Sequence, residues 1–307
     1  MYKRCFGKNI NNKVIFITSE FCRNFCQKAE NRGVKLAYAS YQSTKQILPK
    51  KESPLVIIHG LFGSKRNWQS LGKAFAKTGR KVVAVDCRNH GESPHTDKMD
   101  YYMMCEDIQL LLEELQISKA NIIGHSMGGK VAMTLALTKP GLVDKLIIED
   151  ISPRVSPVLE VYPAYMSAMQ EITFDNTVPL SQIRKFVVEH LESVVPDAMT
   201  REFIATNIKE TQDEIHWGIN LDTIDRCFEK IADFPKFTNC FQGDTLFIAG
   251  RNSQHIRKID FPLIKQLFPE SRVEYIEDAG HWVHVEKPRE FMKAVIQFLN
   301  PEEQTPE

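Results

Sequence analysis

The chain has 307 residues, of which 43% are hydrophobic and 25% are charged, as is ordinary for a globular protein. Lys and Arg together number 39, and so do Asp and Glu, so the formal net charge is zero. This balance argues against a nucleic-acid partner, which binds through clustered positive charge. No run of about eighteen apolar residues occurs, so the sequence predicts no transmembrane segment.

The start of the chain is basic and poor in acidic residues. Residues 1–35 contain Glu20 and Glu30 as their only acids, whereas Lys and Arg recur throughout this segment. Such a composition is typical of a mitochondrial transit peptide. We therefore expect residues 1–32 to be a leader and the mitochondrial matrix to be the destination. The alternative is a cytoplasmic protein with a basic start.

The cysteines give no sign of a disulfide framework or a metal site. There are seven, an odd number without regular spacing, which favours a reducing compartment. Cys22 and Cys26 lie four residues apart, but no further pair of His or Cys nearby completes a set of four ligands. The sequence predicts neither a metal nor a cofactor.

Short apolar runs alternate with helical patterns along most of the chain. Residues 33–41 alternate crudely and predict an early strand. Continuous apolar runs, which are typical of strands buried on both faces of a parallel sheet, occupy residues 54–59, 81–86, 121–123, 146–148, 245–249 and 272–276. Helical periodicity appears at residues 101–116, 129–138 and 288–299. Alternating strands and helices predict an α/β fold with a mostly parallel central sheet flanked by helices.

One long segment interrupts this alternation. Residues 152–240 contain several helical stretches, five prolines and no convincing buried strand. The segment is too long for a simple crossover. We expect it to be a helical cap, inserted after the sixth strand and lying over the sheet. The core is then formed by residues 33–151 and 241–300, and residues 301–307 form a tail.

Residues 124–128 read GHSMG, between a predicted strand and a predicted helix. A serine at such a sharp turn has a crowded backbone, which the flanking glycines relieve. The amides and the positive dipole end of the following helix point toward any negative charge that develops there. The motif predicts Ser126 as a nucleophile.

The segment HGLFGS at residues 59–64 follows the first buried strand directly. Acyl transfer requires amide donors aimed at the oxyanion of its tetrahedral intermediate. The amide of Met127 is one expected donor, and the amide of Leu61 is the second, with Phe62 less favoured. His59 and Gly60 are expected to shape this loop.

Three histidines compete for the role of general base. His281 lies just after the last strand, where a side chain reaches the edge of the sheet from which Ser126 emerges. His284 lies nearer the last helix and is expected to pack or cap it. His125 adjoins the serine, but neighbouring side chains on a tight turn diverge, so it is expected only to shape the site. We predict His281 as the base.

The acidic member of a triad is missing from one common position. In the loop GRNSQH, the third residue after the glycine is Ser253, and the nearest acid, Asp260, is too far along the chain. Asp150 instead ends an earlier strand, on the rim where open parallel sheets bind ligands. Glu149 should face the other side of that strand. Asp150 is the predicted acid, and Asp222 in the cap is a less favoured candidate, better explained as a helix cap.

The segment DCRNHGES at residues 86–93 also follows a buried strand. Asp86 and Arg88 are expected to form a structural polar network around a glycine turn, and His90 is expected to be structural too.

Together these motifs resemble the α/β-hydrolase superfamily over residues 33–300, and within it a branch of lipid hydrolases and bacterial esterases. In that branch the acid follows the strand after the nucleophile helix, as Asp150 does here, and Arg251 is a departure from the usual GNS loop. The resemblance implies a serine hydrolase for lipid or short-chain esters, including diacylglycerol, with mitochondrial residence in animals.

The expected reaction is hydrolysis of carboxylic or thio esters of apolar acyl groups through an acyl-enzyme on Ser126. The substrate partner is then a small-molecule or lipid ester, and the sequence names no protein partner. A serine at the turn argues against epoxide hydrolase or haloalkane dehalogenase chemistry. The alternative hypothesis is a binding or protein-stabilising factor that keeps the fold with little or no turnover. Cofactor-free oxygen or C–C bond chemistry on the same fold is a third class.

Overall fold

The computed structural model describes residues 33–43, 52–156 and 160–301. The predicted leader at residues 1–32 and nearly all of the predicted tail lie outside these ranges. Residues from Gly33 onward form one compact unit. In the described part of the chain, no helix is long and apolar enough to span a membrane.

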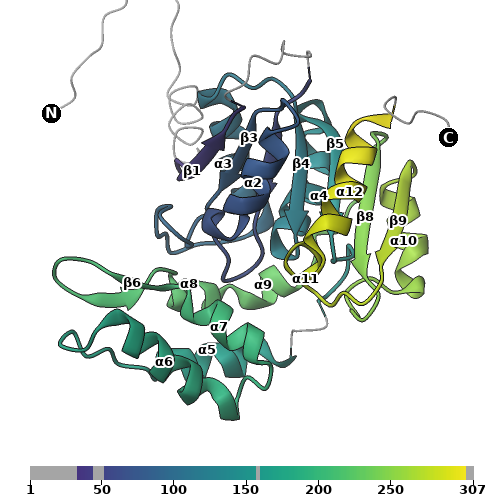
Figure 1. Cartoon of the computed structure of the whole chain (residues 1–307). Coiled ribbons are helices and arrows are strands. Elements are labelled where there is room, and N and C mark those ends of the chain that lie inside the picture. The colour runs from purple at the N-terminus through teal and green to yellow at the C-terminus, as the bar shows by residue number, and fades with distance from the viewer. Residues whose placement is uncertain (1–32, 44–51, 157–159, 302–307) are drawn as a thin grey trace, which may run out of the picture. The chain divides into compact units, whose positions relative to one another are not determined.

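Seven strands of the described residues form one sheet, in the order β1-β3-β2-β4-β5-β8-β9 (Figure 1). Their bounds are β1 Tyr38–Tyr41, β2 Leu55–Ile58, β3 Val82–Val85, β4 Ala120–His125, β5 Val143–Glu149, β8 Thr245–Gly250 and β9 Ser271–Ile276. Only β1 pairs antiparallel, with β3, and the other pairs are parallel. The predicted mostly parallel α/β sheet is confirmed.

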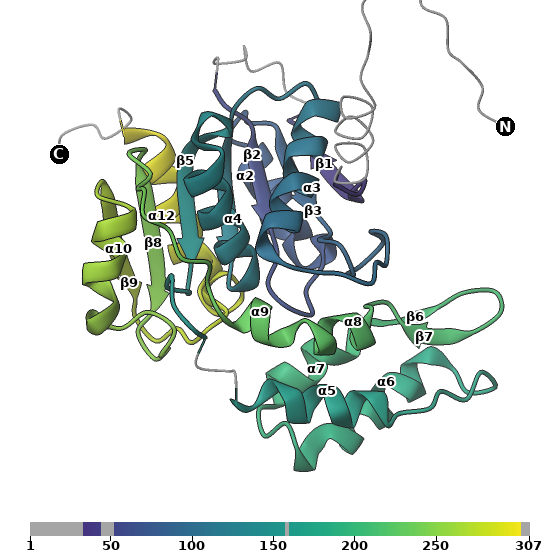
Figure 2. The same cartoon turned by 180° about the vertical axis from the view of Figure 1, so that it is seen from behind.

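Alternate side chains of the strands enter two separate apolar layers, so both faces of the sheet are buried. Ile57 and Ile123 pack with Phe75 and Phe291, whereas Ile58 and Ile122 belong to the opposite layer. The first layer lies under α2 (Gln69–Ala76), α11 (Val283–Glu286) and α12 (Pro288–Leu299), which are in front in Figure 1. The second lies under α3 (Tyr101–Glu114), α4 (Met127–Thr138) and α10 (Phe261–Leu267), in front in Figure 2. This double burial explains why the strands read as continuous apolar runs.

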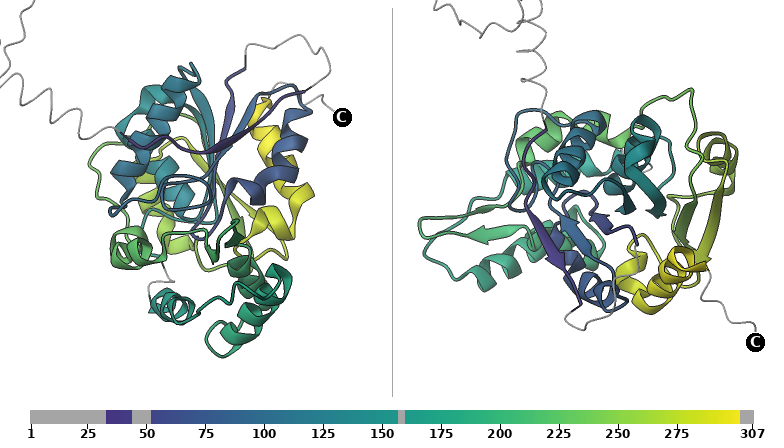
Figure 3. Two further views of the ribbon diagram at one scale, coloured as in Figure 1. Left: turned by 90° about the vertical axis from the view of Figure 1, so that its left-hand side faces the viewer. Right: turned by 90° about the horizontal axis from the view of Figure 1, so that it is seen from above.

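The cap follows β5, which is the fifth strand of the described chain, so the expectation of an insertion after the sixth strand is wrong by one. It lies at the carboxyl ends of the parallel strands, as Figures 1 and 3 show. Its elements are α5 Tyr162–Gln170, α6 Leu180–His190, α7 Ala198–Ala205, β6 Ile208–Glu210, β7 Ile215–Trp217, α8 Leu221–Arg226 and α9 Phe228–Ala232. Short 3-10 turns occupy η1 Lys65–Trp68, η2 Pro140–Leu142, η4 Leu191–Ser193 and η5 Lys258–Asp260.

The cap is not purely helical, which corrects the second part of that expectation. β6 and β7 pair antiparallel, with Ile208 opposite Trp217 and Glu210 opposite Ile215. Each strand has only three residues, too few for an alternating pattern to be recognised in the sequence.

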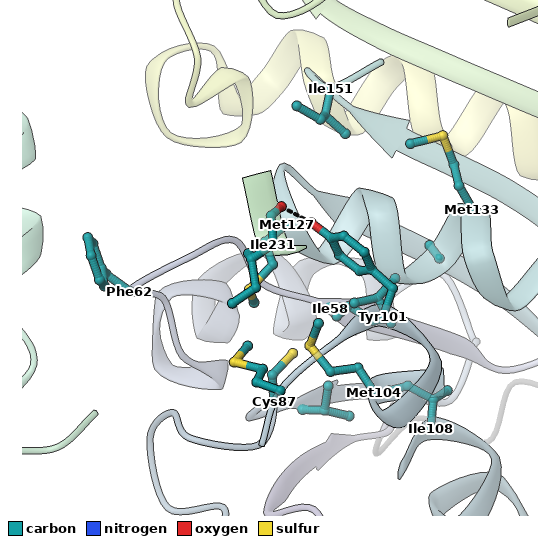
Figure 4. Packing of buried hydrophobic residues seen from close by; sticks show 14 of the residues in the cluster. Ile58, Phe62, Cys87, Tyr101, Met104, Ile108, Met127, Met133, Ile151 and Ile231 are labelled. Atoms are coloured by element: carbon teal, nitrogen blue, oxygen red, sulfur yellow. Dashed lines mark hydrogen bonds between the residues drawn. The ribbon is translucent and has the colours of Figure 1, made fainter. Parts of the chain in front are cut away.

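Two buried side chains of the core bind the end of the last cap helix. The carbonyl groups in the final turn of a helix have no partner within it. Here the hydroxyl of Tyr101 donates to the carbonyl of Ile231 (Figure 4), and Lys130 Nζ donates to the carbonyls of Ala232 at 2.7 Å and Asp233 at 2.9 Å. Burial lowers the pKa of Lys130 to about 7. Since Lys130 lies on α4, which starts after Ser126, these bonds connect the cap to the nucleophile helix.

We predict that Tyr101→Phe lowers the free energy of unfolding by about 1–2 kcal/mol, because it leaves the buried carbonyl of Ile231 without its donor. Urea denaturation followed by circular dichroism measures this change. The neighbouring Tyr102, which is half exposed and packs on Phe237, provides a matched control. Tyr102→Phe should change stability by less than about 0.5 kcal/mol, and equal losses in both variants would contradict the role given to the Tyr101 hydroxyl.

Candidate active site

Ser126 occupies a strained turn between β4 and α4. Its φ of 51° and ψ of −116° lie in a region that costs a residue with a Cβ about 1–3 kcal/mol. The turn is possible because a Cβ at Gly124 would collide with the carbonyl of Gly128, and one at Gly128 would collide with the carbonyl of Ile58. The amide of Ser126 donates to the carbonyl of Glu149 at 3.0 Å, and the side chain is half-buried. The turn therefore presents the hydroxyl at the carboxyl end of the sheet.

The loop after β2 lies against this turn. The amide of Gly63 donates to the carbonyl of Gly60 at 2.9 Å, and a Cβ at Gly60 would lie 3.2 Å from Cβ of Ser126. Phe62 has a φ of 60°, and its amide donates to Nε2 of His90 at 3.2 Å. The Phe62 amide is thus already used, which disfavours it as an oxyanion donor.

The amides of Leu61 and Met127 meet no acceptor among the residues that the structure describes. Met127 is the first residue of α4, where backbone amides have no intrahelical partner. Unused donors beside the serine are what an oxyanion hole requires.

Buried neutral histidines hold the loop in shape. Nδ1 of His59 donates to the carbonyl of Gly60 at 2.7 Å, and its Nε2 accepts from the amide of Cys87 at 2.9 Å. Nδ1 of His90 contacts the carbonyl of Arg88 at 3.0 Å. Burial lowers the pKa of both rings, that of His90 to about 3. Both rings remain neutral near pH 7, so each nitrogen keeps its role as donor or acceptor.

Asp150 and His281 lie together at the carboxyl end of the sheet. Nδ1 of His281 donates to Oδ2 of Asp150 at 2.8 Å. Asp150 is fully buried, and its Oδ1 accepts from the amide of Gly250 at 3.0 Å. Asp222 is elsewhere, exposed on α8, and accepts from Nε2 of Gln170 at 3.1 Å. The structure therefore brings Asp150, and not Asp222, to His281.

Ser253 occupies the position where the sequence lacks a carboxylate. Its hydroxyl donates to Oδ2 of Asp150. The loop after β8 thus supplies a donor to the acid instead of the acid itself. Sequence analysis noted the missing carboxylate but assigned no role to the serine.

A second carboxylate–histidine pair lies behind the first. Both the amide and Nδ1 of His284 donate to Oε1 of Glu149 at 2.8 Å. The ring of His284 stacks on Trp68 with 4.1 Å between centroids, which is the packing role expected from the sequence. β5 ends at Glu149, and Asp150 follows it with a φ of 47°, so the backbone turns between the two acids. Asp150 binds His281 in the loop after β9, and Glu149 binds His284 in α11.

His125 connects the two pairs. Its Nε2 donates to the carbonyl of His281 at 3.1 Å, and burial holds its pKa well below the usual range. Ligand atoms of His125, Glu149 and His284 lie within 4.8 Å of one another, a spacing that a metal ion accepts. Hydrogen bonds within the cluster already engage Nδ1 of His284 and Nε2 of His125. The cluster is therefore explained without a metal ion, as a hydrogen-bond network that positions the loop carrying His281.

Asp86 and its glycine turn form the polar network expected near the second buried strand. Oδ1 of Asp86 accepts from the amide of Lys65 at 2.7 Å, and Oδ2 accepts from the amide of Glu92 at 2.8 Å. Arg88 makes two bonds to Asp107, at 2.6 and 2.7 Å. None of these groups contacts His281 or Ser126 in the described residues.

His255 is a neighbour of His281 that the sequence patterns did not predict. Its ring stacks on that of His281, with 3.8 Å between centroids and 19° between planes. The available signal was its place in the loop after β8, two residues beyond Ser253. Only the folded arrangement reveals that this loop covers the ring of His281.

A cavity of about 300 Å³ lies against the loop after β2 and the turn that carries Ser126, although Ser126, Asp150 and His281 are not among its lining residues. Gly60 and His125, which flank the serine in space and in sequence, contribute to its wall. Apolar side chains from α7, from the loop after β9 and from α11 form much of the rest, including Met199, Phe203, Trp282 and Val285. Its size is at the lower end of small-molecule sites.

The family model for the alpha/beta hydrolase fold matches residues 53–288. The sn-1-specific diacylglycerol lipase ABHD11 of Danio rerio is 43% identical over 250 residues, which cover 81% of this chain and 79% of the relative. Esterase YbfF of Escherichia coli (strain K12) is 31% identical over 249 residues, covering 81% of this chain and 93% of the relative. A solved structure named Marine microorganism esterase has a TM-score of 0.78 at 32% identity, and the match covers 87% of this chain and 100% of that one.

The family-model match spans the turn that carries Ser126, the cap, and the segments that carry Asp150 and His281. By this match and by the identity to its relatives, the chain belongs to the α/β-hydrolase fold family.

Proposed function

We propose that this protein hydrolyses carboxylic esters of apolar acyl groups, with Ser126 as nucleophile, His281 as base and Asp150 as acid. The hydrogen bond between Asp150 and His281 at the end of the sheet carries the proposal. The names of the relatives, a diacylglycerol lipase and esterases, support ester hydrolysis.

The reaction begins with the transfer of the Ser126 proton to Nε2 of His281. Asp150 holds Nδ1–H of the imidazole, so Nε2 is the nitrogen left to accept a proton, and the carboxylate stabilises the imidazolium that forms. The serine oxygen bonds to the ester carbonyl carbon, and the oxyanion receives hydrogen bonds from the amides of Leu61 and Met127. Each such donor lowers the barrier by roughly 3 kcal/mol.

Collapse of this intermediate breaks the ester C–O bond. The imidazolium of His281 gives its proton to the leaving alcohol, and an acyl-enzyme remains on Ser126. Water then attacks the acyl carbon while His281 accepts its proton. The bond between the acyl carbon and the Ser126 oxygen breaks, the serine oxygen takes the proton back from His281, and the carboxylic acid is released.

The substrate class follows from the cavity and the relatives. Met199 and Phe203 of the cap and Trp282 of the core give the cavity a largely apolar wall, which suits a hydrocarbon chain. Relatives named as sn-1-specific diacylglycerol lipases support a lipid ester, and diacylglycerol is the candidate that we propose. The alternative of a binding or protein-stabilising factor is not favoured, because the proposed acid and base are hydrogen-bonded and amide donors without an acceptor in the described part of the chain flank Ser126 at the carboxyl end of the sheet.

Labelling with a fluorophosphonate tests the nucleophile. We expect the wild-type protein to be labelled, and Ser126→Ala to lose both labelling and ester turnover, the latter by roughly 10⁶-fold. Ser152, a buried residue between β5 and the first helix of the cap, serves as a control, since Ser152→Ala should still be labelled. Absence of labelling in the wild-type protein would refute the proposal.

A pair of isosteric variants tests the acid. Asp150→Asn keeps the shape of the side chain but removes the charge that stabilises the imidazolium, so kcat should fall by roughly 10³- to 10⁴-fold. Asp222→Asn, on the exposed side of α8, should stay within about twofold, because surface changes away from the site have small effects. Steady-state kinetics on a p-nitrophenyl ester measures both, and the reverse ranking would make Asp222 the acid.

We further propose a mitochondrial location, with residues 1–32 as the transit peptide. The support is the excess of Lys and Arg over Asp and Glu in this segment. N-terminal sequencing of the protein purified from mitochondria should find a new terminus within or near residues 1–32. An intact Met1 in protein from the cytoplasm would contradict the proposal.

A further inference from the structure

His255 stacks on the proposed catalytic base. The centroids of the His255 and His281 rings are 3.8 Å apart and their planes differ by 19°. Other rings near His281 do not stack in this way, because His125 lies at 4.8 Å and 44°, and Trp282 at 6.4 Å and 42°. One face of the base is therefore covered by His255.

The position of the His255 ring is fixed by burial and by its backbone. The residue is only 8% exposed, and its amide contacts the hydroxyl oxygen of Ser253 at 3.2 Å. Since the Ser253 hydroxyl donates to Asp150, one short loop contacts both the acid and the base.

The charges around His255 keep its ring neutral. Burial lowers the pKa of His255 to about 2, and the nearby positive charges of His281, Lys130 and Arg154 act in the same direction. Lys130 reaches it from α4, and Arg154 comes from the segment after β5, where it is paired with Asp260. Nδ1 of His255 has no hydrogen-bond partner among the described residues. The ring thus presents a neutral aromatic face to His281.

A neutral aromatic face suits a base that becomes charged during the reaction. His281 carries a positive charge after each proton transfer from Ser126 or from water. Aromatic faces attract cations within about 6 Å. A face at van der Waals distance also prevents the imidazole from rotating out of the plane in which it donates to Asp150.

We propose that His255 is a positioning residue for the base: it holds the His281 ring in its productive orientation and stabilises the imidazolium by stacking. The inference rests on the proposed function, because it assigns a partner to the base of that reaction.

Two substitutions separate stacking from simple packing. His255→Phe keeps an aromatic ring, whereas His255→Leu keeps apolar volume without a ring. We expect His255→Leu to lower kcat by about 3- to 30-fold, as the loss of a cation–aromatic contact predicts, with little change in KM. His255→Phe should stay within about threefold of the wild-type protein.

The pH profile provides the readout that packing alone would not change. Without the aromatic face the imidazolium is less stable, so the base loses its proton at lower pH. The acidic limb of kcat/KM should therefore move to lower pH by roughly half a unit in His255→Leu, and return toward the wild-type position in His255→Phe. His190 of α6, an exposed histidine on the cap, is the control, and His190→Leu should leave the limb unchanged.

Equal losses of kcat in the Phe and Leu variants, or an unmoved acidic limb in His255→Leu, would overturn the inference. If His255→Leu fails to fold by circular dichroism, the flexible His255→Met replaces it in the same comparison. A wild-type protein that is neither labelled by the fluorophosphonate nor active on esters would instead refute the proposed function. These two failures are distinguishable because the inference is tested only by differences between active variants.

Discussion

The buried carboxylate of Asp150 is the interaction on which the arrangement of the site depends. Burying a carboxylate away from water costs free energy unless the carboxylate receives hydrogen bonds. Asp150 receives three, from the amide of Gly250, the hydroxyl of Ser253 and Nδ1 of His281. These donors come from the end of β8 and from the loop after β9. The sheet order β5-β8-β9 is therefore what brings Asp150, its hydrogen-bond donors and His281 together.

Two consecutive acids, the last residue of β5 and the residue after it, bind two different histidines. Asp150 accepts from His281, and Glu149 accepts from the amide and ring of His284, three residues further on in α11. His125 adds a bond to the carbonyl of His281. The segment around His281 is thus held by several hydrogen bonds. These bonds fix the backbone on both sides of the His281 imidazole and so fix the position of the ring. A base that must reach a serine hydroxyl benefits from such preorganisation.

The cap is joined to the same machinery. The side-chain amide of Asn207, just after α7, donates to the carbonyl of Phe62 at 2.8 Å, and the backbone amide of Phe62 donates to His90. Lys130 and Tyr101 bind the carbonyls at the end of α9. The loop that offers the Leu61 amide is consequently held from the cap as well as from the core. Placement of the cap and shape of the proposed oxyanion hole are physically coupled.

Much of this site was predictable from the sequence because its parts follow strands. Ser126, Asp150 and His281 each follow the carboxyl end of a predicted strand within a few residues, and the carboxyl ends of parallel strands share one edge of a sheet. The expectation that Glu149 points away from Asp150 also agrees with the structure, although Asp150 lies just beyond β5 with a φ of 47°. The sequence already favoured Leu61 over Phe62, and the structure adds the physical reason, since the Phe62 amide donates to His90, 28 positions along the chain.

The sequence by itself thus determined the sheet class, the serine turn and the strand ends that carry the acid and the base, because local apolar patterns and tight turns impose them. Only the tertiary structure decided the rest. The cap hairpin is too short to leave a pattern. The support of Asp150 by Ser253, the stacking of His255 on His281 and the apolar cavity under α7 join residues that are close in space but far apart in the chain. No local periodicity encodes such contacts, which arise only when the loops after β5, β8 and β9 meet.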